Sequence, residues 1–328
     1  ILKIETDATA QCGGQILTRL EAFLESLRAQ KGESMLFKNK RQQSENYSTE
    51  TQDAVSDTAN AKTANTTDAP VYVMGIDSGS TSTNAVILNG NREIVASAVI
   101  RTGAKSGESA QRILEEILQK ANLQRSDLTK IVSTGYGRVS IPFADENVTE
   151  ISCHGKGAHY LNPEIRTILD IGGQDSKAIH LNEKGDVTDF VMNDKCAAGT
   201  GRFLEVMANT LSLRPNEMFD LARMGSDTTI SSMCTVFAES EVIGLIGKGE
   251  PKENIAYAVV NSTIRKVAAQ VSRMNGEMST FCLTGGLCEC EYIREALSKE
   301  LGKEVISCPD ARYAGAIGAA LSAMKIRK

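Results

Sequence analysis

Three glycine-containing segments carry residue types that bind a polyphosphate, and each follows an apolar run typical of a buried strand. The first, residues 75–84, places the carboxylate of Asp77 and the flexible backbone of Gly79 before a run of hydroxyl and amide side chains. Glycine lets a backbone approach a phosphate closely, and hydroxyl and backbone N–H groups can donate hydrogen bonds to it. The side-chain donors of this segment are Ser80, Thr81, Ser82, Thr83 and Asn84.

The other two segments repeat this arrangement further along the chain. In residues 170–176, Asp170 and Asp175 flank Gly172 and Gly173, and a third pair, Gly285-Gly286, follows another apolar run. Two such loops facing each other would clamp a polyphosphate, and their carboxylates would hold Mg²⁺ through water. One loop alone is more often a tight turn, but three in matched positions favour a nucleotide site. None of them is a GxxxxGK[ST] or GxGxxG loop.

Two of the eight cysteines lie just before predicted helices. Cys196 precedes a helix near residues 202–211, and Cys234 precedes one at 238–247. The partial positive charge of a helix N-terminus favours a thiolate or an anionic iron–sulfur cluster. A [4Fe–4S] cluster usually needs four thiolates, so two cysteines per chain would suffice only if two chains shared one cluster. A single cysteine is more often a small buried hydrophobe, and we interpret these as structural: Cys12, Cys282, Cys288, Cys290 and Cys308. Cys153 and the adjacent His154 could form a ligand pair, but we expect them to be structural or near the interface.

These segments need strands and helices to position them, and the apolar periodicity predicts a set that occurs twice. In each half, three strands precede a helix, and the two glycine loops with aspartates follow the first strand of their half. This duplication predicts two α/β lobes related by a pseudo-two-fold axis. Predicted strands are 71–77, 85–88, 94–100, 130–134, 167–173, 178–181, 187–192, 280–284 and 303–307; predicted helices are 108–121, 202–211, 238–247, 253–275, 290–301 and 313–325.

The first 69 residues differ in composition from the rest. Residues 1–31 contain one amphipathic helical pattern and no partner for it, so we expect the end of a preceding domain. Residues 32–69 are rich in Ser, Thr, Asn, Gln, Asp, Glu and Ala and have almost no large apolar side chains after Phe37. Such a stretch cannot bury enough surface to offset its ordering entropy, which predicts a flexible linker. The two-lobed domain is expected to span 70–328.

Composition narrows the possible functions. Among 328 residues, 36 Lys and Arg against 41 Asp and Glu give a formal net charge of −5, which argues against a general nucleic-acid-binding or membrane-binding surface. No apolar run approaches the roughly 18 residues that a membrane span needs. Eight cysteines are too few for a secreted disulfide scaffold, so we expect a cytoplasmic protein.

Residues 70–326 resemble the superfamily of acetate kinase, sugar kinases, actin and heat-shock-chaperone ATPases. Within it, residues 135–138 (GYGR), 170–177 (DIGGQDSK), 193–203 (NDKCAAGTGRF) and 231–243 (SSMCTVFAESEVI) are similar to the ATP-dependent activators of 2-hydroxyacyl-CoA dehydratases, which are related to the ATPase subunits of benzoyl-CoA reductase. The resemblance implies an actin-like fold with two ribonuclease-H-like lobes and a nucleotide cleft between them. The first lobe would span about 70–160 plus the C-terminal helix, and the second about 161–310.

The resemblance also implies partners and residue roles. One [4Fe–4S] cluster would lie on the two-fold axis of a homodimer, held by Cys196 and Cys234 of both subunits. ATP or ADP would bind with Mg²⁺ held by Asp77 and Asp170, and Gln174 or Asp175 would orient the attacking water. Glu289 and Arg312 stand where the family places polar groups around the adenosine. A ferredoxin or flavodoxin would supply the electron, and a dehydratase-type or double-cubane-cluster enzyme would receive it.

Two features of the sequence depart from this picture or extend it. The family commonly has Lys where this chain has Asn84, which would weaken nucleotide binding or transfer the role to Lys177. Residues 5–25 resemble the tail of a dehydratase-type or double-cubane-cluster subunit, so we expect a fusion of the electron acceptor to its ATPase. The alternatives are a sugar-type kinase of the same superfamily, and a regulatory ATPase whose cluster only joins the subunits.

Overall fold

The computed structural model describes residues 71–231, 234–276 and 278–324. The predicted end of a preceding domain (1–31), the predicted linker (32–69) and Cys12 lie outside the described residues. Within the described part of the chain, no helix is long and apolar enough to cross a membrane.

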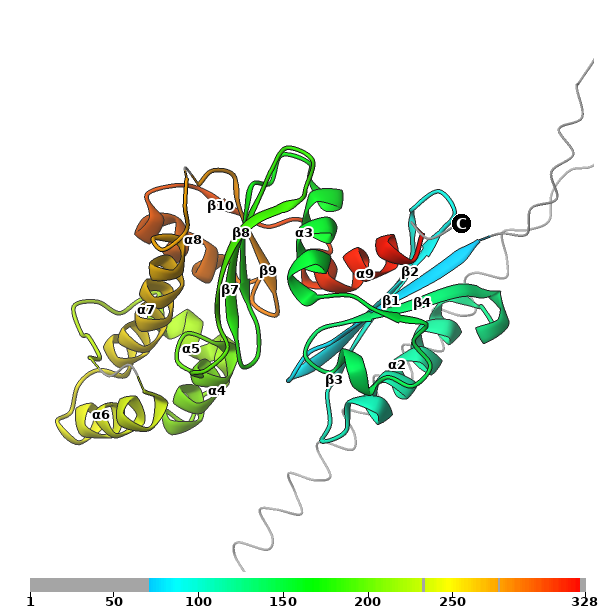
Figure 1. Cartoon of the computed structure of the whole chain (residues 1–328). Coiled ribbons are helices and arrows are strands. Elements are labelled where there is room, and N and C mark those ends of the chain that lie inside the picture. Colours follow the sequence, from blue (N-terminus) through cyan, green and yellow to red (C-terminus); the bar gives the residue numbers. More distant parts are fainter. Residues whose placement is uncertain (1–70, 232–233, 277, 325–328) are drawn as a thin grey trace, which may run out of the picture. The chain divides into compact units, whose positions relative to one another are not determined.

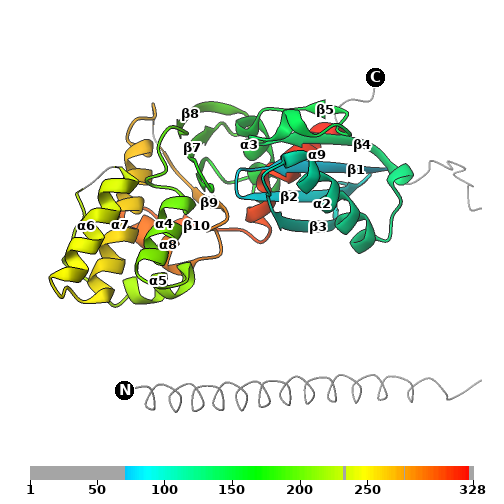
Figure 2. The ribbon, with the colours of Figure 1, turned by 90° about the horizontal axis from the view of Figure 1, so that it is seen from below.

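The first sheet has the strand order β3-β2-β1-β4-β5, and Figure 2 labels all five strands. Strands β1 to β3 are antiparallel neighbours, whereas β4 runs parallel to β1 and β5 parallel to β4. Alternate residues of β1 point to opposite faces, so Met74 and Ile76 pack against one set of side chains and Val73 against another. The strands are β1 (Tyr72–Ser78), β2 (Ser82–Asn89), β3 (Ile94–Arg101), β4 (Leu128–Thr134) and β5 (Glu146–Asn147).

Two helices cover the faces of this first sheet. On one face, α2 (Ser106–Ala121) buries Ile113, Leu114 and Ile117 against β1, β2 and β3. On the other face lies α9 (Ala314–Met324), from the far end of the described chain, which buries a largely small-residue surface against β1, β2 and β4. The first sheet is therefore covered on this face by a helix that begins at residue 314, whereas its last strand ends at residue 147.

The second sheet repeats the first in strand order and direction. Read from β8, its order is β8-β7-β6-β9-β10, with β6 to β8 antiparallel and β9 and β10 parallel to β6. This equivalence confirms the predicted duplication, with β1 corresponding to β6 and β4 to β9. The strands are β6 (Thr167–Ile171), β7 (Ser176–Leu181), β8 (Val187–Asn193), β9 (Phe281–Gly285) and β10 (Val305–Ile306).

The two faces of the second sheet carry very different helices. Figures 1 and 2 show α4 to α8 gathered on one side of it and α3 on the other. The larger side forms the main core of this lobe, around Phe203, Met207, Val259 and Ile264. The helices are α3 (Glu150–Leu161), α4 (Gly201–Thr210), α5 (Pro215–Ala222), α6 (Thr235–Gly247), α7 (Lys252–Val271) and α8 (Glu291–Leu301).

Helices α3 and α9 cross in close contact between the two sheets (Figure 1). A side chain at Gly157 of α3 would overlap the carbonyl oxygen of Ala314, and one at Gly318 of α9 would overlap that of Cys153. Glycine at both positions lets the two backbones touch. The sequence did not predict α3 or α5, because two glycines weaken the helical pattern of α3 and α5 has only eight residues.

Candidate functional site

The turns that follow β1, β6 and β9 meet at one cavity of about 540 Å³. Asp77 and Asp170 occupy equivalent positions near the ends of equivalent strands, so the duplicated sheets bring their carboxylates to the same cavity from opposite sides. The predicted residues that line it are Asp77, Gly79, Ser80, Thr81, Ser82, Asn84, Asp170, Gly172, Gly173, Gln174, Asp175, Gly285, Gly286 and Arg312.

Close backbone packing holds these turns. The Gly79 N–H donates to the Ser82 carbonyl at 3.0 Å, and the Gly172 N–H to the Asp175 carbonyl at 3.0 Å, which closes the first two turns. A side chain at Gly173 would overlap Thr81, so the turns of the two lobes touch where glycine leaves room. The cavity is thus formed by both halves of the duplication.

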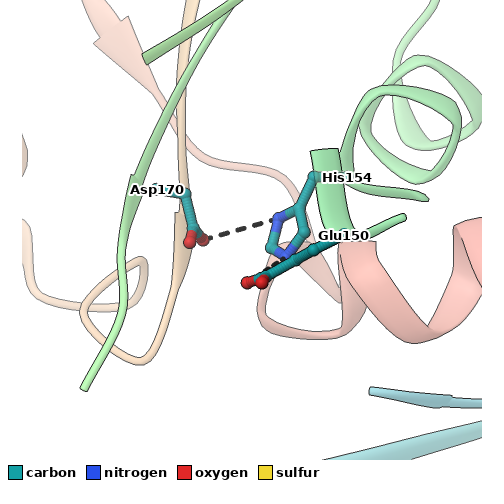
Figure 3. A group of neighbouring side chains, drawn as sticks. All are labelled: Glu150, His154 and Asp170. Carbon is teal, nitrogen blue, oxygen red and sulfur yellow. Dashed lines mark ion pairs between the residues drawn. The ribbon is translucent and has the colours of Figure 1, made fainter. Parts of the chain in front are cut away.

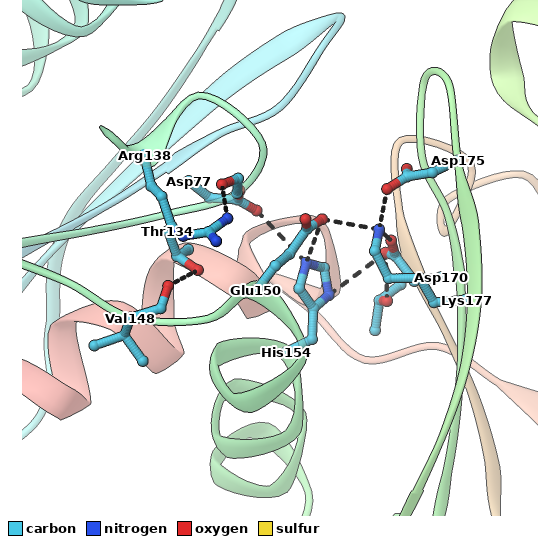
Figure 4. Close-up of polar contacts among 11 residues, drawn as sticks. Asp77, Thr134, Arg138, Val148, Glu150, His154, Asp170, Asp175 and Lys177 are labelled. Atoms are coloured by element: carbon cyan, nitrogen blue, oxygen red, sulfur yellow. Dashed lines mark hydrogen bonds and ion pairs between the residues drawn. The ribbon is translucent and has the colours of Figure 1, made fainter. Parts of the chain in front are cut away.

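Lys177 of β7 lies at the centre of a buried group of charges (Figure 4). Its ammonium is 2.8 Å from a Glu150 oxygen, 2.8 Å from Asp175 and 3.1 Å from Asp170. Burial alone would lower the pKa of Lys177, but these carboxylates, led by Asp170, raise it above its ordinary value. Lys177 is only 1% exposed. Its charge is therefore already shared among three carboxylates rather than directed only at a ligand.

His154 of α3 lies between the aspartates of the two lobes. Its Nε2 is 3.6 Å from Asp77 Oδ2, and its Nδ1 is 3.6 Å from Asp170 Oδ1. Figure 3 shows the imidazole with Glu150, one helical turn earlier, and Asp170 across the cleft. These three side chains offer potential ligand atoms within 4.8 Å of one another. The arrangement places one imidazole among carboxylates from both lobes.

Burial and neighbouring charges change the pKa values of this group in different directions. Burial disfavours the charged imidazole, but Asp170 and Asp77 outweigh it and raise the pKa of His154 to about 9. Burial would also raise the pKa of Asp170, yet His154, Lys177 and the Thr284 hydroxyl lower it to about 2. For Glu150, burial is the largest effect and raises the pKa, with Lys177 opposing it. Glu150 is thus the carboxyl group of this set most disposed to hold a proton.

The charge balance of the cavity suits a divalent cation. In the buried group at its centre, four acidic side chains, those of Asp77, Glu150, Asp170 and Asp175, outnumber the two basic ones, Lys177 and His154. Carboxylate oxygens are the protein ligands that Mg²⁺ prefers. Side chains at Gly135 and Gly315 would overlap the Asp77 carboxylate, so glycine at both positions gives it room at the cavity wall.

Another part of the cavity wall is apolar. It includes Leu204 of α4, Pro215 and Phe219 of α5, and Leu287, which follows the third glycine turn. Such a wall can bind the face of a flat aromatic ring. Arg312, in the short helix Ala311–Tyr313, also lines the cavity and is 3.1 Å from Glu289.

Three predicted residues have surroundings that the sequence did not indicate. Strand β2 begins at Ser82, and successive side chains of a strand point to opposite faces. Ser82 and Asn84 therefore face the cavity, whereas Thr83 faces away from it. The Thr83 hydroxyl is hydrogen-bonded to the Thr102 hydroxyl at 2.8 Å. Glu289 does not line the cavity; its side chain is 74% exposed and pairs with Arg312. Asn84 is 8% exposed, and within the described residues its Oδ1 has no hydrogen-bond partner.

The two candidate ligand cysteines lie in the second lobe, outside this cavity. Cys196 is half-buried in the loop between β8 and α4, and Cys234 is exposed at the N-cap of α6. The Asn193 amide donates to the carbonyls of Cys196 at 2.9 Å and Ala198 at 3.2 Å, which holds the first loop. None of the described cysteines forms a disulfide.

Helix α6 exposes an apolar surface directly after Cys234. Val236, Phe237, Ile243 and Ile246 are 67%, 68%, 56% and 45% exposed, whereas Ala238 and Val242 on the opposite face are buried. A second cavity, of about 410 Å³, is lined by residues 191–195 and 198–199 around Cys196, by residues 228–231 before Cys234, and by one face of α7. Exposed apolar side chains grouped on one helix are typical of a protein–protein contact.

Residues 74–323 match the model of the BadF/BadG/BcrA/BcrD ATPase family. The chain belongs to this family. It is 44% identical over 254 residues to the activator of lactoyl-CoA dehydratase from Anaerotignum propionicum. The aligned region covers 77% of this chain and 97% of that protein. These values agree with the family resemblance expected from the glycine and cysteine segments.

Two solved structures are similar to the two described lobes. Component A of the Acidaminococcus fermentans (R)-2-hydroxyglutaryl-CoA dehydratase has a TM-score of 0.73 and 42% identity, covering 78% of this chain and 98% of that one. The Clostridium difficile activator of 2-hydroxyisocaproyl-CoA dehydratase, solved with bound ADPNP, has a TM-score of 0.72 and 41% identity, covering 77% and 94%. The predicted two-lobed, actin-like ATPase fold is confirmed.

The sequence did not identify two side chains at the centre of this family member's cleft. Glu150 and His154 were not predicted as site residues, and His154 was interpreted with Cys153 as structural. Their spacing of four residues places them on one helix face, which would have been informative had α3 been predicted. Lys177 was expected only as a substitute for the missing lysine at position 84.

Proposed function

We propose that this chain, as a homodimer, is an ATP-driven one-electron donor to a partner iron–sulfur enzyme of the dehydratase or reductase class. The family and its relatives support the ATPase part, and the C. difficile relative was solved with an ATP analogue. Mg·ATP binds in the 540 Å³ cavity, with phosphates at the three glycine turns and the base against the apolar wall. Asp77 and Asp170 would hold Mg²⁺, which would supply positive charge to support phosphoryl transfer to water.

Side chains around the phosphates orient the attacking water. Gln174 and Asp175 line the cavity in the turn after β6, and Glu150, whose pKa is raised, can accept a proton. ATP and water then give ADP and phosphate, with the released proton held first by a carboxylate of the cleft. Arg312, which lines the cavity and pairs with Glu289, would contact the nucleoside.

A [4Fe–4S] cluster would be held by Cys196 and Cys234 from both chains. The donor set fits such a cluster, since two thiols per chain, one half-buried and one exposed, require a second chain to supply four. The exposed apolar face of α6 begins immediately after Cys234 and provides a surface for that second chain. The cluster would accept one electron from a ferredoxin or flavodoxin.

One backbone connection carries the proposal, because it joins the nucleotide turn to the cysteine loop. The Gly201 N–H donates to the Gly172 carbonyl at 2.9 Å, and the Arg202 N–H donates to the Gly173 carbonyl at 2.8 Å. These residues begin α4, whose first residue follows Cys196 by only five positions. A change in the turn that contacts phosphate therefore moves the helix end beside a cluster ligand, which is how ATP can drive electron transfer.

The test is iron and sulfide content with electron paramagnetic resonance of the dithionite-reduced protein, purified without oxygen. We expect one cluster per two chains in the wild-type protein and none in Cys196→Ser or Cys234→Ser. Cys290→Ser is the matched control, because Cys290 also caps a helix (α8) and should not affect the cluster. A normal cluster in either ligand variant would disprove this ligand assignment.

ATP turnover tests the other half of the proposal. Asp170→Asn should lower ATP hydrolysis by roughly 10²-fold or more, because it removes a preorganised charge beside the transferred phosphate. An iron-free wild-type protein that phosphorylates a sugar would instead establish the kinase alternative. ATP turnover with an intact cluster and no electron delivery would establish the regulatory ATPase.

A further inference from the structure

We propose that Lys266 is a positioning residue that makes the cluster at Cys196 easier to reduce. This inference rests on the proposed function, because it concerns a ligand of the proposed cluster. Lys266 is on α7, a helix that carries neither candidate ligand cysteine and neither aspartate of the cleft. Its ammonium nevertheless donates a hydrogen bond to Cys196 Sγ, at 3.6 Å.

The surroundings hold the Lys266 side chain in this position. A Cβ atom built at Gly199 would lie 3.0 Å from Lys266 Cδ, 3.1 Å from Cγ and 3.2 Å from Cβ, so the lysine stem runs closely over that residue. Gly199 has a φ of +85°, a conformation that residues with side chains rarely adopt. Glycine at position 199 therefore allows the backbone conformation of the Cys196 loop and leaves room for the aliphatic part of the Lys266 side chain.

The charge of Lys266 is also available to the sulfur. Within the described residues, Lys266 forms no salt bridge, whereas Lys195, adjacent to Cys196 in the sequence, pairs with Asp194 at 2.8 Å. Lys266 is half-buried beside the second cavity, so water screens its charge less than it screens an exposed one. Of the two lysines closest to the cysteine loop, Lys266 is thus the one directed at the ligand.

A cation at a ligand sulfur favours the reduced state. Reduction adds one electron and one negative charge to the cluster and its thiolates, and breaks no bond. An ammonium beside one thiolate stabilises the more negative state, and hydrogen bonds to the sulfurs are among the factors that set cluster potentials. Lys266 should therefore raise the midpoint potential and assist loading of the electron.

Arg265 provides a matched control for this effect. It precedes Lys266 on α7, is exposed, and lines the same second cavity. No hydrogen bond joins it to Cys196 within the described residues. Removing the charge of Arg265 changes the net charge of the protein as much as removing the charge of Lys266. It leaves the hydrogen bond between Lys266 and the Cys196 sulfur in place.

The experiment is a redox titration of the iron-loaded dimer, with dithionite as electron source and electron paramagnetic resonance as readout. In Lys266→Met, the ratio of reduced to oxidised cluster at a fixed potential should fall roughly tenfold, which equals about 59 mV for one electron. In Lys266→Arg and Arg265→Met the same ratio should stay within about threefold of the wild-type value, since both variants keep a cation at the sulfur. Iron content is measured on every sample.

The possible outcomes separate this inference from the proposed function. An iron-loaded Lys266→Met protein with unchanged potential, or an equal shift in Arg265→Met, overturns the role of Lys266 alone. If Lys266→Met does not retain iron, the titration is repeated with Lys266→Gln, which keeps a neutral N–H donor. The ratio of reduced to oxidised cluster should again fall roughly tenfold, and an unchanged ratio overturns the role of Lys266. A wild-type protein that binds no iron overturns the proposed function and this inference together.

Discussion

The cleft and the cysteine-bearing end of the second lobe differ in how far their side chains find partners within the chain. In the cleft, carboxylates from both lobes already pair with Lys177 and His154 of the same chain. At the cysteine end, α6 leaves Phe237 and Ile243 more than half exposed next to an exposed thiol. The charged groups of the first region are paired within one chain, whereas the second region exposes apolar side chains and a thiol. Substitutions should therefore affect folding in the cleft and assembly at α6.

The largest effect on folding is expected from Lys177→Met. Removing one member of a buried ion pair leaves the other charges uncompensated, which typically destabilises by about 3–5 kcal/mol. Here Glu150, Asp170 and Asp175 would each lose the contact with the ammonium, although His154 remains beside Glu150 and Asp170. Urea unfolding followed by circular dichroism measures the change. Lys195→Met removes an exposed pair instead and should change stability by less than about 1 kcal/mol; equal effects would contradict the comparison.

His154 should give the cleft a dependence of stability on pH. Its pKa is raised from 6.5 to about 9 in the folded protein, so its contribution is complete below pH 6.5 and is lost as the pH rises through 9. The contribution should be roughly 3 kcal/mol, at about 1.4 kcal/mol per pKa unit. The free energy of unfolding is measured against pH in EDTA and without nucleotide. Between pH 6.5 and 9 it should vary less with pH in His154→Gln than in the wild type, and above pH 9 the two proteins should approach the same value. Parallel curves for the two proteins would rule this out.

Two glycines that look equivalent in the sequence should respond differently to alanine. A side chain at Gly173 would overlap Thr81 of the other lobe, and inserting a group into a packed contact costs about 1–3 kcal/mol. Gly286 has no atom within 4 Å of the corresponding position. Gly173→Ala should lower the unfolding temperature in calorimetry, whereas Gly286→Ala should leave the unfolding temperature unchanged. A tolerant Gly173 would mean that the lobes do not touch there.

Much of the fold could be predicted because strands and turns have local signals. Apolar runs ending in Asp-and-glycine turns predicted β1 and β6, and the duplication followed from their spacing. Strand β2 begins at Ser82, three residues before the predicted strand, because its first residues are polar in sequence but lie at the cleft. That difference decides which face Thr83 occupies.

The remaining part of the site depends on contacts between distant segments. Gly155 and Gly157 weaken the helical signal of α3, whereas in the folded chain the helix packs on α9 and on the second sheet. His154 therefore looked structural in the sequence, although α3 brings it between Asp77 and Asp170. Lys266 could not be predicted either, since it meets Cys196 across 70 residues of chain.

The smallest effect on folding is expected at α6, where a single side chain should instead control assembly. Phe237 is 68% exposed, so Phe237→Ser removes few contacts within the chain and should change the unfolding free energy of the monomer by no more than about 0.5 kcal/mol. Phe203, 1% exposed in the core of the same lobe, is the matched control, and Phe203→Ser should cost about 3–5 kcal/mol.

Sedimentation equilibrium then separates folding from assembly. Phe237→Ser should shift the protein from dimer to monomer and lower its iron content, because a monomer supplies only Cys196 and Cys234 to the cluster. A Phe237→Ser protein that remains a dimer with full iron content would show that the second chain contacts another surface. A strongly destabilised monomer would show that α6 packs within its own chain, and the contrast between the two regions would then not hold.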